Sequence, residues 1–218
     1  MMLLLFLIIF LFSLYVFSKD DFVLLRKNVT QNTIFDFAFL TGIVGLFFSR
    51  LVYVLSHFSP LFLNPLVFFV IPYFPGLSFA GLLLGGAATV YLLAIRKKVP
   101  VGRVFDIFSF ALLITSTISF LENAVVHVLH KAYLVAGAYG ILTILLCSTY
   151  VVAHGIFIKS SWKDGKISLL LLSVIALAAI IGEEVRMQFQ SVNGEVPYFL
   201  VFLIFLLISF LYQKFRKV

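Results

Sequence analysis

The residues best placed to do chemistry are charged groups inside long apolar stretches of the chain. Arg50, Glu122 and the cluster of Glu183, Glu184 and Arg186 each lie late in such a stretch. A charged side chain is costly in hydrocarbon, so each is a candidate site residue. The alternative is an ion-pair network that only locks helices together.

A second polar pattern begins inside the apolar stretch 104–127 and continues just beyond it. At about 100° per residue, five polar side chains fall within an arc of about 80° on one face of a helix. They are Ser116, Ser119, Asn123, His127 and His130. Such a stripe indicates a face turned toward the bundle or a watery cavity, although interhelical hydrogen bonding alone would explain the serines. The two histidines come last, where water can reach them.

Metal chemistry finds little support in the sequence. Glu122, His127 and His130 have suitable residue types but lack a third firm ligand, so we expect no metal and no other cofactor. Cys147 is the single cysteine, which excludes an internal disulfide and fits a small buried hydrophobe. Asp36 and Asp106 open their apolar stretches, where they can reach the interface or pair with Arg103, so we expect structural roles for both.

Glycines cluster where another apolar stretch begins. Gly76, Gly81, Gly85 and Gly86 follow a segment, 58–75, that contains four prolines. Gly81 and Gly85 form a small-xxx-small face, which is typical of close helix packing. The functional alternative is close approach of the backbone to an anionic headgroup at a helix N-terminus.

The composition decides which class of protein must position these residues. Of the 218 residues, 63% are hydrophobic and only 11% are charged. A soluble domain is nearer about 25% charged, because it needs polar surface. The chain is therefore expected to be an integral membrane protein in which residues 1–218 form one membrane domain. The formal charge of +7 does not indicate nucleic-acid binding.

Seven stretches are long and apolar enough to cross a bilayer as helices. We predict spans at about 2–18, 33–56, 76–95, 104–127, 133–158, 167–188 and 198–213. The segment 58–75 is apolar but too rich in proline for a continuous helix, so we expect an interfacial or re-entrant segment. The first stretch has its basic residues after it and is expected to be an uncleaved anchor.

The positive charges predict the orientation of these spans. Thirteen of the sixteen Lys and Arg residues fall in alternate loops and in the tail. By the positive-inside rule, this places the N-terminus outside and the C-terminus inside. Arg50, Glu122 and the 183–186 cluster then share one depth, in the outer leaflet.

Two segments resemble the prolipoprotein diacylglyceryl transferase family of bacteria. Residues 45–55 (GLFFSRLVYVL) are similar to its Gly-(Ala/Gly)-Arg-(Leu/Ile)-Gly-Tyr-Val-Leu segment, and residues 76–86 (GLSFAGLLLGG) to its Gly-Gly-(Leu/Met)-Ser-Phe-His-Gly-Gly run. Asn64-Pro65-Leu66 between them and Asp106 after them also match in order and spacing. The strong resemblance covers the stretch from about Ala38 to Asn123.

The resemblance implies a reaction in the outer leaflet of the bacterial cytoplasmic membrane. Enzymes of this family move the diacylglyceryl group of phosphatidylglycerol onto the lipobox cysteine of a preprolipoprotein and release glycerol phosphate. The substrate-binding residues expected here are Arg50, Ser78, Gly81, Asn123, Glu122 and Arg186, and the catalytic ones are His127 and Glu183.

Three basic residues of the family have no counterpart in this chain. Ala80 stands where the family has a histidine, Phe120 where it has an arginine, and the first arginine of its last motif falls near Ala179. Two readings follow: a divergent transferase with a rearranged site, or a non-catalytic member that binds phospholipid or a lipoprotein segment. A transporter is less favoured, because no inverted repeat is evident.

Overall fold

The fold is a bundle of long helices in the computed structural model, which describes residues 2–57, 62, 64, 67–68, 76–158, 164–190, 202–204, 206 and 208. Its helices are α1 (Met2–Lys19), α2 (Phe22–Arg26), α3 (Gln31–Ser56), α5 (Phe79–Arg96), α6 (Val101–Leu129), α7 (Tyr133–Ile158) and α8 (Lys166–Gln190). The described part of the chain is helical, with no strand.

Five of these helices have the length and hydropathy to cross a membrane, namely α3, α5, α6, α7 and α8, and the apolar part of α1 is shorter. The chain is therefore a multi-pass membrane protein, and the predictions of helices for the first six spans are confirmed. The predicted span 198–213 and the segment 58–75 lie mostly outside the described residues, so the count of seven spans stays a prediction.

Two predicted starts differ from the structure by three residues: α6 begins at Val101 rather than at 104, and α5 begins at Phe79 rather than at Gly76. Ser78 is the N-cap: its Oγ accepts a hydrogen bond from the Gly81 N–H at 3.0 Å. Gly76 lies before the helix with a φ of 148°, which a side chain rarely adopts. An unrecognised serine cap explains the difference at α5.

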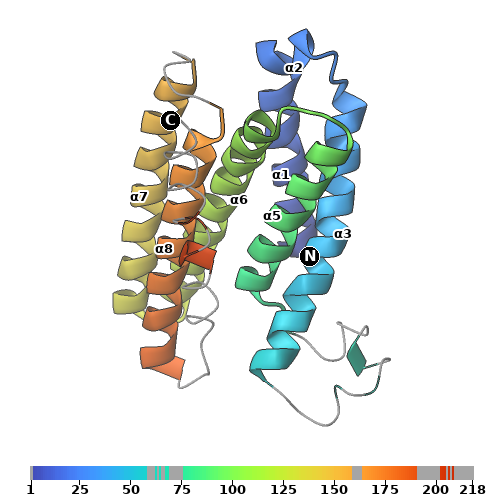
Figure 1. Ribbon diagram of the computed structural model, residues 1–218. Helices are drawn as coiled ribbons and strands as arrows, with labels where there is room; N and C mark the ends of the chain where they lie inside the picture. The colour runs from blue at the N-terminus through green and yellow to red at the C-terminus, as the bar shows by residue number, and fades with distance from the viewer. Residues whose placement is uncertain are drawn as a thin grey trace.

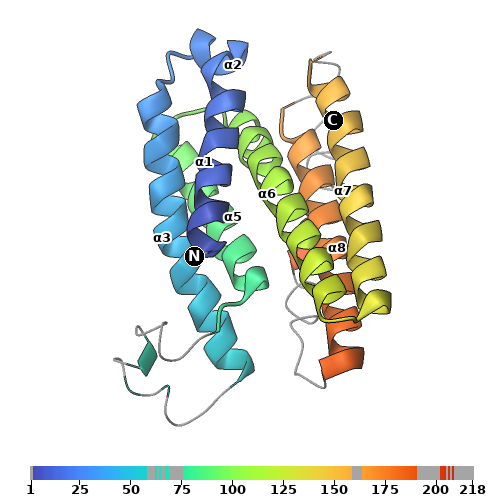
Figure 2. The same ribbon diagram turned by 180° about the vertical axis from the view of Figure 1, so that it is seen from behind.

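The helices form two groups with α6 between them (Figure 1). One group holds α1, α3 and α5, and the other holds α7 and α8; Figure 2 shows the same division from behind. Opposite faces of α6 pack against the two groups. Ile107 and Phe108 join the core of the first group, whereas Phe110 and Leu113 join the core of the second.

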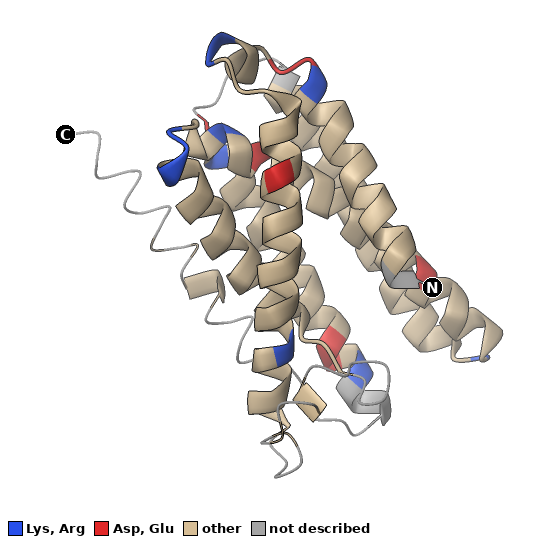
Figure 3. Ribbon diagram, turned by 90° about the vertical axis from the view of Figure 1, so that its right-hand side faces the viewer, with Lys and Arg blue, Asp and Glu red and all other residues tan. Residues whose placement is uncertain are grey.

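Basic residues gather at one end of the bundle, which we call the basic end (Figure 3). The connection from α1 to α3, the connection from α5 to α6 and the start of α8 lie there (Figure 1). The described residues concerned are Lys19, Arg26, Lys27, Arg96, Lys97, Lys98, Arg103 and Lys166. This arrangement agrees with the alternation of basic and non-basic loops along the sequence. The orientation of the bundle in the membrane remains a prediction.

Arg103 ties the basic end together. Its Nε donates to Asp21 Oδ2 at 2.7 Å, and its Nη1 lies 3.8 Å from Asp164 Oδ1. The guanidinium also lies over the ring of Phe157, at 3.9 Å from the centroid. Asp21 is buried and caps α2 by accepting the N–H groups of Val23 and Leu24. One arginine thus joins the N-cap of α2, α6, α7 and the residues just before α8.

The close packing of α3 against α5 depends on glycine. A Cβ on Gly81 would lie 2.6 Å from the carbonyl oxygen of Phe48 and 2.8 Å from the Cα of Ser49. A Cβ on Gly85 would lie 2.5 Å from the Cβ of Phe48. Gly81 and Gly85 therefore allow close packing of the two helices, which is the packing role predicted for this small-xxx-small face.

We expect Gly81→Ala to lower the free energy of unfolding by about 1–3 kcal/mol, because the backbones of α3 and α5 must separate. Thermal unfolding in detergent micelles would measure the change. Gly137→Ala on α7 is the control, since a Cβ there meets nothing within 4 Å. Equal melting temperatures for the two variants would show that the close approach of α3 and α5 contributes no stability.

Candidate functional site

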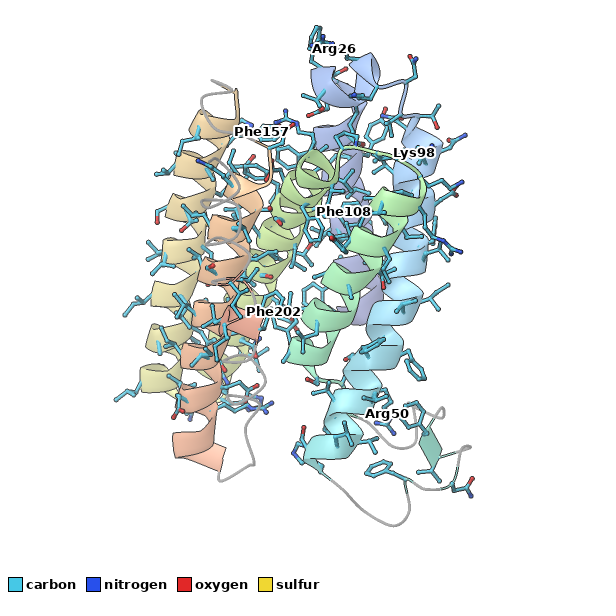
Figure 4. All side chains as sticks on the ribbon, viewed as in Figure 1. Arg26, Arg50, Lys98, Phe108, Phe157 and Phe202 are labelled. Carbon is cyan, nitrogen blue, oxygen red and sulfur yellow. The ribbon has the colours of Figure 1, made fainter. Side chains whose placement is uncertain are left out.

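A cavity of about 520 Å³ lies between the two groups of helices. Side chains from α1, α3, α5, α6 and α8 line it, and α7 contributes Tyr139. Figure 4 shows Phe108, one of the lining residues, on α6 between the two groups. The volume is in the range of sites that bind small molecules, about 300–1,000 Å³.

The end of the cavity nearer the basic end is mostly apolar, and its polar lining groups are the hydroxyls of Thr41 and Ser109. Val90 of α5 lies in the half of its helix that runs up to Arg96, and Phe10 lies midway along α1. Phe105 and Phe108 lie early in α6, close after Arg103. No charged side chain lines the cavity among these described residues, so this part suits hydrocarbon.

The far end of the cavity holds the charged side chains of the described lining. Ser119 and Asn123 lie late in α6, which begins at the basic end, and Glu183 and Arg186 lie late in α8, which begins there too. The charged and amide side chains of the described lining therefore lie toward the far end of the cavity, while apolar residues line both ends. Such a site can bind an elongated molecule that has an apolar part and a polar head.

Buried polar atoms without a hydrogen-bond partner concentrate in this cavity. Among the described residues they are Thr41 Oγ1, Ser116 Oγ, Glu183 Oε2 and Arg186 Nε. All four belong to residues that line the cavity. Leaving a buried donor or acceptor unsatisfied costs about 1–3 kcal/mol, so groups of this kind are usually paired with ordered water or a bound molecule.

Glu183 and Arg186 form an ion pair on adjacent turns of α8. Arg186 Nη2 lies 3.0 Å from Glu183 Oε2, and the side chains are 41% and 18% exposed for the arginine and the glutamate. Apart from this ion pair, Glu183 Oε2 has no hydrogen-bond partner among the described groups. The structure brings these two predicted site residues together in the cavity.

Three members of the predicted polar stripe also line the cavity: Ser116, Ser119 and Asn123. Ser116 is buried. Asn123 is exposed and donates from Nδ2 to the Ser119 carbonyl oxygen at 2.8 Å, one turn earlier. The polar face of α6 is thus turned toward the space between the helix groups over this part of its length.

His127 and His130 are placed differently from the rest of the stripe. His127 stacks on Tyr139 with ring centroids 5.5 Å apart and an interplanar angle of 6°. Tyr139 lines the cavity, and its hydroxyl donates to the Gly182 carbonyl oxygen at 3.1 Å. His127 is not among the described lining residues, and His130 is the exposed C-cap of α6.

Glu122 is partly exposed and is likewise not one of the described residues on the lining. Within the described ranges, no three His, Cys, Asp or Glu residues gather in a way that could hold a metal ion. The structure therefore does not bring Glu122 to the groups that share the cavity.

Arg50 is buried, at 2% exposure, and binds backbone rather than the cavity (Figure 4). It donates from Nε to the Phe68 carbonyl oxygen at 3.0 Å, from Nη1 to that of Gly76 at 2.8 Å and from Nη2 to that of Val67 at 3.2 Å. The rings of Tyr53 and Phe62 lie 5.6 and 5.2 Å from its guanidinium carbon. Arg50 therefore joins the end of α3 to the chain that leads into α5.

Ser78 and Gly81 lie in the contact between α3 and α5, apart from the described cavity lining. Ser78 is fully buried; its N–H donates to the Ser49 carbonyl oxygen, and its own carbonyl accepts from Ser49 Oγ at 2.8 Å. Gly85 packs in the same contact, whereas Gly86 does line the cavity.

Asp106 fixes the start of α8, whereas the sequence suggested contact with the interface or with Arg103. It is 1% exposed and accepts the N–H groups of Gly165 at 2.9 Å and Ser168 at 2.8 Å. The carboxylate thus caps a helix 60 residues away in the chain, which a local pattern does not reveal. Asp36, by contrast, is exposed on α3.

We expect Asp106→Ala to lower the free energy of unfolding by about 1–3 kcal/mol, because two buried N–H groups lose their acceptor. The control is Asp36→Ala, which removes an exposed carboxylate and should change stability by less than about 0.5 kcal/mol. Thermal unfolding of both variants in one detergent would check this. A melting temperature for Asp106→Ala equal to that of Asp36→Ala would contradict the capping role.

Comparison with known proteins connects this geometry to one family. A family model described as prolipoprotein diacylglyceryl transferase matches residues 1–130. The matched range reaches the end of α6, so it includes the lining residues of α1, α3, α5 and α6 and stops before Glu183 and Arg186. No curated protein is similar enough in sequence to match the chain.

Proposed function

The chain belongs to the prolipoprotein diacylglyceryl transferase family, and on this premise we propose that its cavity holds a membrane phospholipid as the diacylglyceryl donor. One observation supports the proposal above the others. The buried polar atoms that lack hydrogen-bond partners among the described residues all belong to residues that line one cavity, and its charged and amide side chains lie toward one end. A phospholipid likewise carries its charged headgroup at one end.

The proposed pose follows from the direction of the helices. The headgroup phosphate lies at Arg186, the hydroxyl and amide groups of Ser116, Ser119 and Asn123 face the glycerol and ester oxygens, and the acyl chains extend toward Phe108. Glu183 holds the guanidinium of Arg186 in place. With the N-terminus outside, the polar end lies in the outer leaflet of a bacterial cytoplasmic membrane.

The proposed reaction transfers the diacylglyceryl group to the lipobox cysteine of a prolipoprotein. The thiol sulfur forms a bond to the terminal glycerol carbon, and the bond from that carbon to the phosphate oxygen breaks. The thiol proton ends on the released phosphate monoester, which is glycerol phosphate if phosphatidylglycerol is the donor. A cation near the phosphate stabilises the charge on the leaving group, and Arg186 is placed for that role.

Two side chains are proposed as the first acceptor of the thiol proton, Glu183 on the lining and His127 behind Tyr139. Removing a general base lowers a rate by about 100- to 10,000-fold. We expect that loss for Glu183→Gln rather than His127→Phe, since the phenylalanine keeps the ring stacked on Tyr139 and His127 is set back from the described lining. The rate of transfer from labelled lipid to a lipobox peptide would decide between them.

The second candidate function is phospholipid binding without transfer. It is favoured by Phe120, which lines the cavity where the family has an arginine, and by Ala80, which is fully buried where the family has a histidine. Purified protein with labelled phospholipid and a lipobox peptide separates the two functions. Release of the phosphate monoester supports transfer, whereas retained lipid without release supports binding alone.

A further inference from the structure

The cavity stops short of the basic end of the bundle. On α1, α3, α5 and α6, side chains between the cavity lining and the basic end belong to one hydrophobic cluster. They include Leu14, Ile34, Phe37, Ala94 and Val104, each at most 1% exposed and none among the described lining residues. Protein interiors contain few voids, so a molecule in the cavity can extend no further toward the basic end without displacing these side chains.

Four side chains form the surface at which the cavity ends, which we call the floor. Phe10, Ala38, Val90 and Phe108 line the cavity and also belong to that cluster or pack against it. The rings of Phe10 and Phe108 meet edge to face, with centroids 6.0 Å apart and an interplanar angle of 69°. Ala38, Val90 and Phe108 are buried, so a ligand that reaches the floor meets a packed surface.

The depth of the floor matches the length of lipid chains. Phe108 and Ser119 are 11 residues apart on α6, which corresponds to about 16 Å along the helix. In the proposed pose, Ser119 lies at the level of the glycerol and ester oxygens. One leaflet of a bilayer has a hydrocarbon thickness of about 15 Å, half of the whole core. The space between the ester oxygens and the floor is therefore about as long as the acyl chains of one leaflet.

We propose that the floor limits the acyl-chain length of the phospholipid that the cavity accepts. The inference rests on the proposed function and specifies its lipid donor by chain length. Methylenes beyond the limit must displace packed side chains, which lowers the affinity by about 5- to 150-fold. Shorter chains lose little by comparison, because a methylene is surrounded by apolar groups in the cavity and in a detergent micelle alike.

A chain-length competition on the intact protein tests this. Detergent-solubilised protein is mixed with an equimolar series of saturated phosphatidylglycerols that differ only in acyl-chain length, and native mass spectrometry measures which of them are bound. The limit is the length beyond which binding falls by at least about fivefold. We expect Ala38→Leu, which raises the floor, to move the limit to shorter chains. Phe10→Ala removes one ring of the floor and should move the limit to longer chains.

Two variants serve as matched controls. Phe12→Ala removes an exposed phenylalanine of α1, and Ala88→Leu enlarges an exposed alanine of α5; neither residue is among the described lining residues. Both should keep the wild-type limit. Melting temperatures show which variants fold, and Phe10→Ala alone decides if Ala38→Leu does not fold.

The outcomes separate this inference from the proposed function. A limit that stays unchanged in the folded floor variants, or wild-type binding without any limit, would overturn the inference while leaving the proposed phospholipid site standing. Binding of no phosphatidylglycerol by the wild type would remove the inference together with the proposed function.

Discussion

Arg103→Met is expected to lower the free energy of unfolding by about 3–5 kcal/mol, because it leaves the buried Asp21 carboxylate without its cation. Asp21 has a side chain only 1% exposed, and Arg103 is its partner at 2.7 Å. The same change removes the contact of Arg103 with Asp164 and its position over the ring of Phe157. Thermal unfolding in detergent micelles, followed by circular dichroism, would measure the loss.

A second substitution separates the electrostatic cause from general disruption. Asp21→Asn keeps an oxygen to cap α2 but removes the negative charge, so adding it to Arg103→Met should restore about 1–2 kcal/mol. Arg26→Met is the control, since Arg26 is an exposed arginine at the same basic end. If Arg103→Met and Arg26→Met melt at the same temperature, the ion pair does not hold this end of the bundle.

Arg186→Gln is expected to weaken phospholipid binding by about 10- to 100-fold, because the phosphate loses its charge-assisted hydrogen bonds. Its effect on stability should be small, below about 1 kcal/mol, since the ion pair with Glu183 is partly exposed, at 41% for the arginine. Dissociation constants for a fluorescent phospholipid and melting temperatures, measured on the same preparations, would show the two effects separately.

The control for this prediction is Lys131→Gln, which removes an exposed cation near the same end of the bundle without touching the described lining. It should bind the fluorescent lipid as the wild type does. Equal affinities of Arg186→Gln and wild type would mean that the phosphate lies elsewhere, even if the cavity holds the acyl chains.

The helices could be predicted from the sequence because hydrocarbon imposes a simple rule. A stretch of about 20 apolar residues must be helical to satisfy its backbone, so the bounds of α3 and α7 follow from composition alone. The polar stripe was predicted from the 100° spacing of residues on a helix. Its members Ser116, Ser119 and Asn123 line the cavity, whereas His127 and His130 are not among the described lining residues. The predicted depth in the membrane also placed Glu183 and Arg186 in one group, and in the structure these two residues form an ion pair.

The partners of the buried charges could not be predicted in the same way. Arg50 binds carbonyl oxygens, which every residue carries and which therefore leave no mark in the sequence. Asp106 accepts from backbone N–H groups 59 and 62 residues further along the chain. Asp21 and Arg103 are 82 residues apart, and only the packing of α1 against α6 brings them together.

Tyr139 was missed because a tyrosine in an apolar helix has an ordinary packing role. The sequence did offer one signal, because a buried tyrosine hydroxyl needs a hydrogen-bond acceptor. For Tyr139 this acceptor is the Gly182 carbonyl oxygen. The ring of Phe120 also lies close to Gly182, because a Cβ on Gly182 would lie 3.0 Å from that ring. Recognising this wall of the cavity requires the three-dimensional packing of α6, α7 and α8.

Filling the cavity tests most directly whether it is the phospholipid site. Ala87 lines the cavity on α5, whereas the adjacent Ala88 is exposed and lies outside the described lining. Native mass spectrometry of the purified proteins would count the phospholipid retained by the wild type, Ala87→Phe and Ala88→Phe. The account predicts one retained phospholipid in the wild type and in Ala88→Phe, and its loss in Ala87→Phe. Equal phospholipid retention in all three proteins would contradict it.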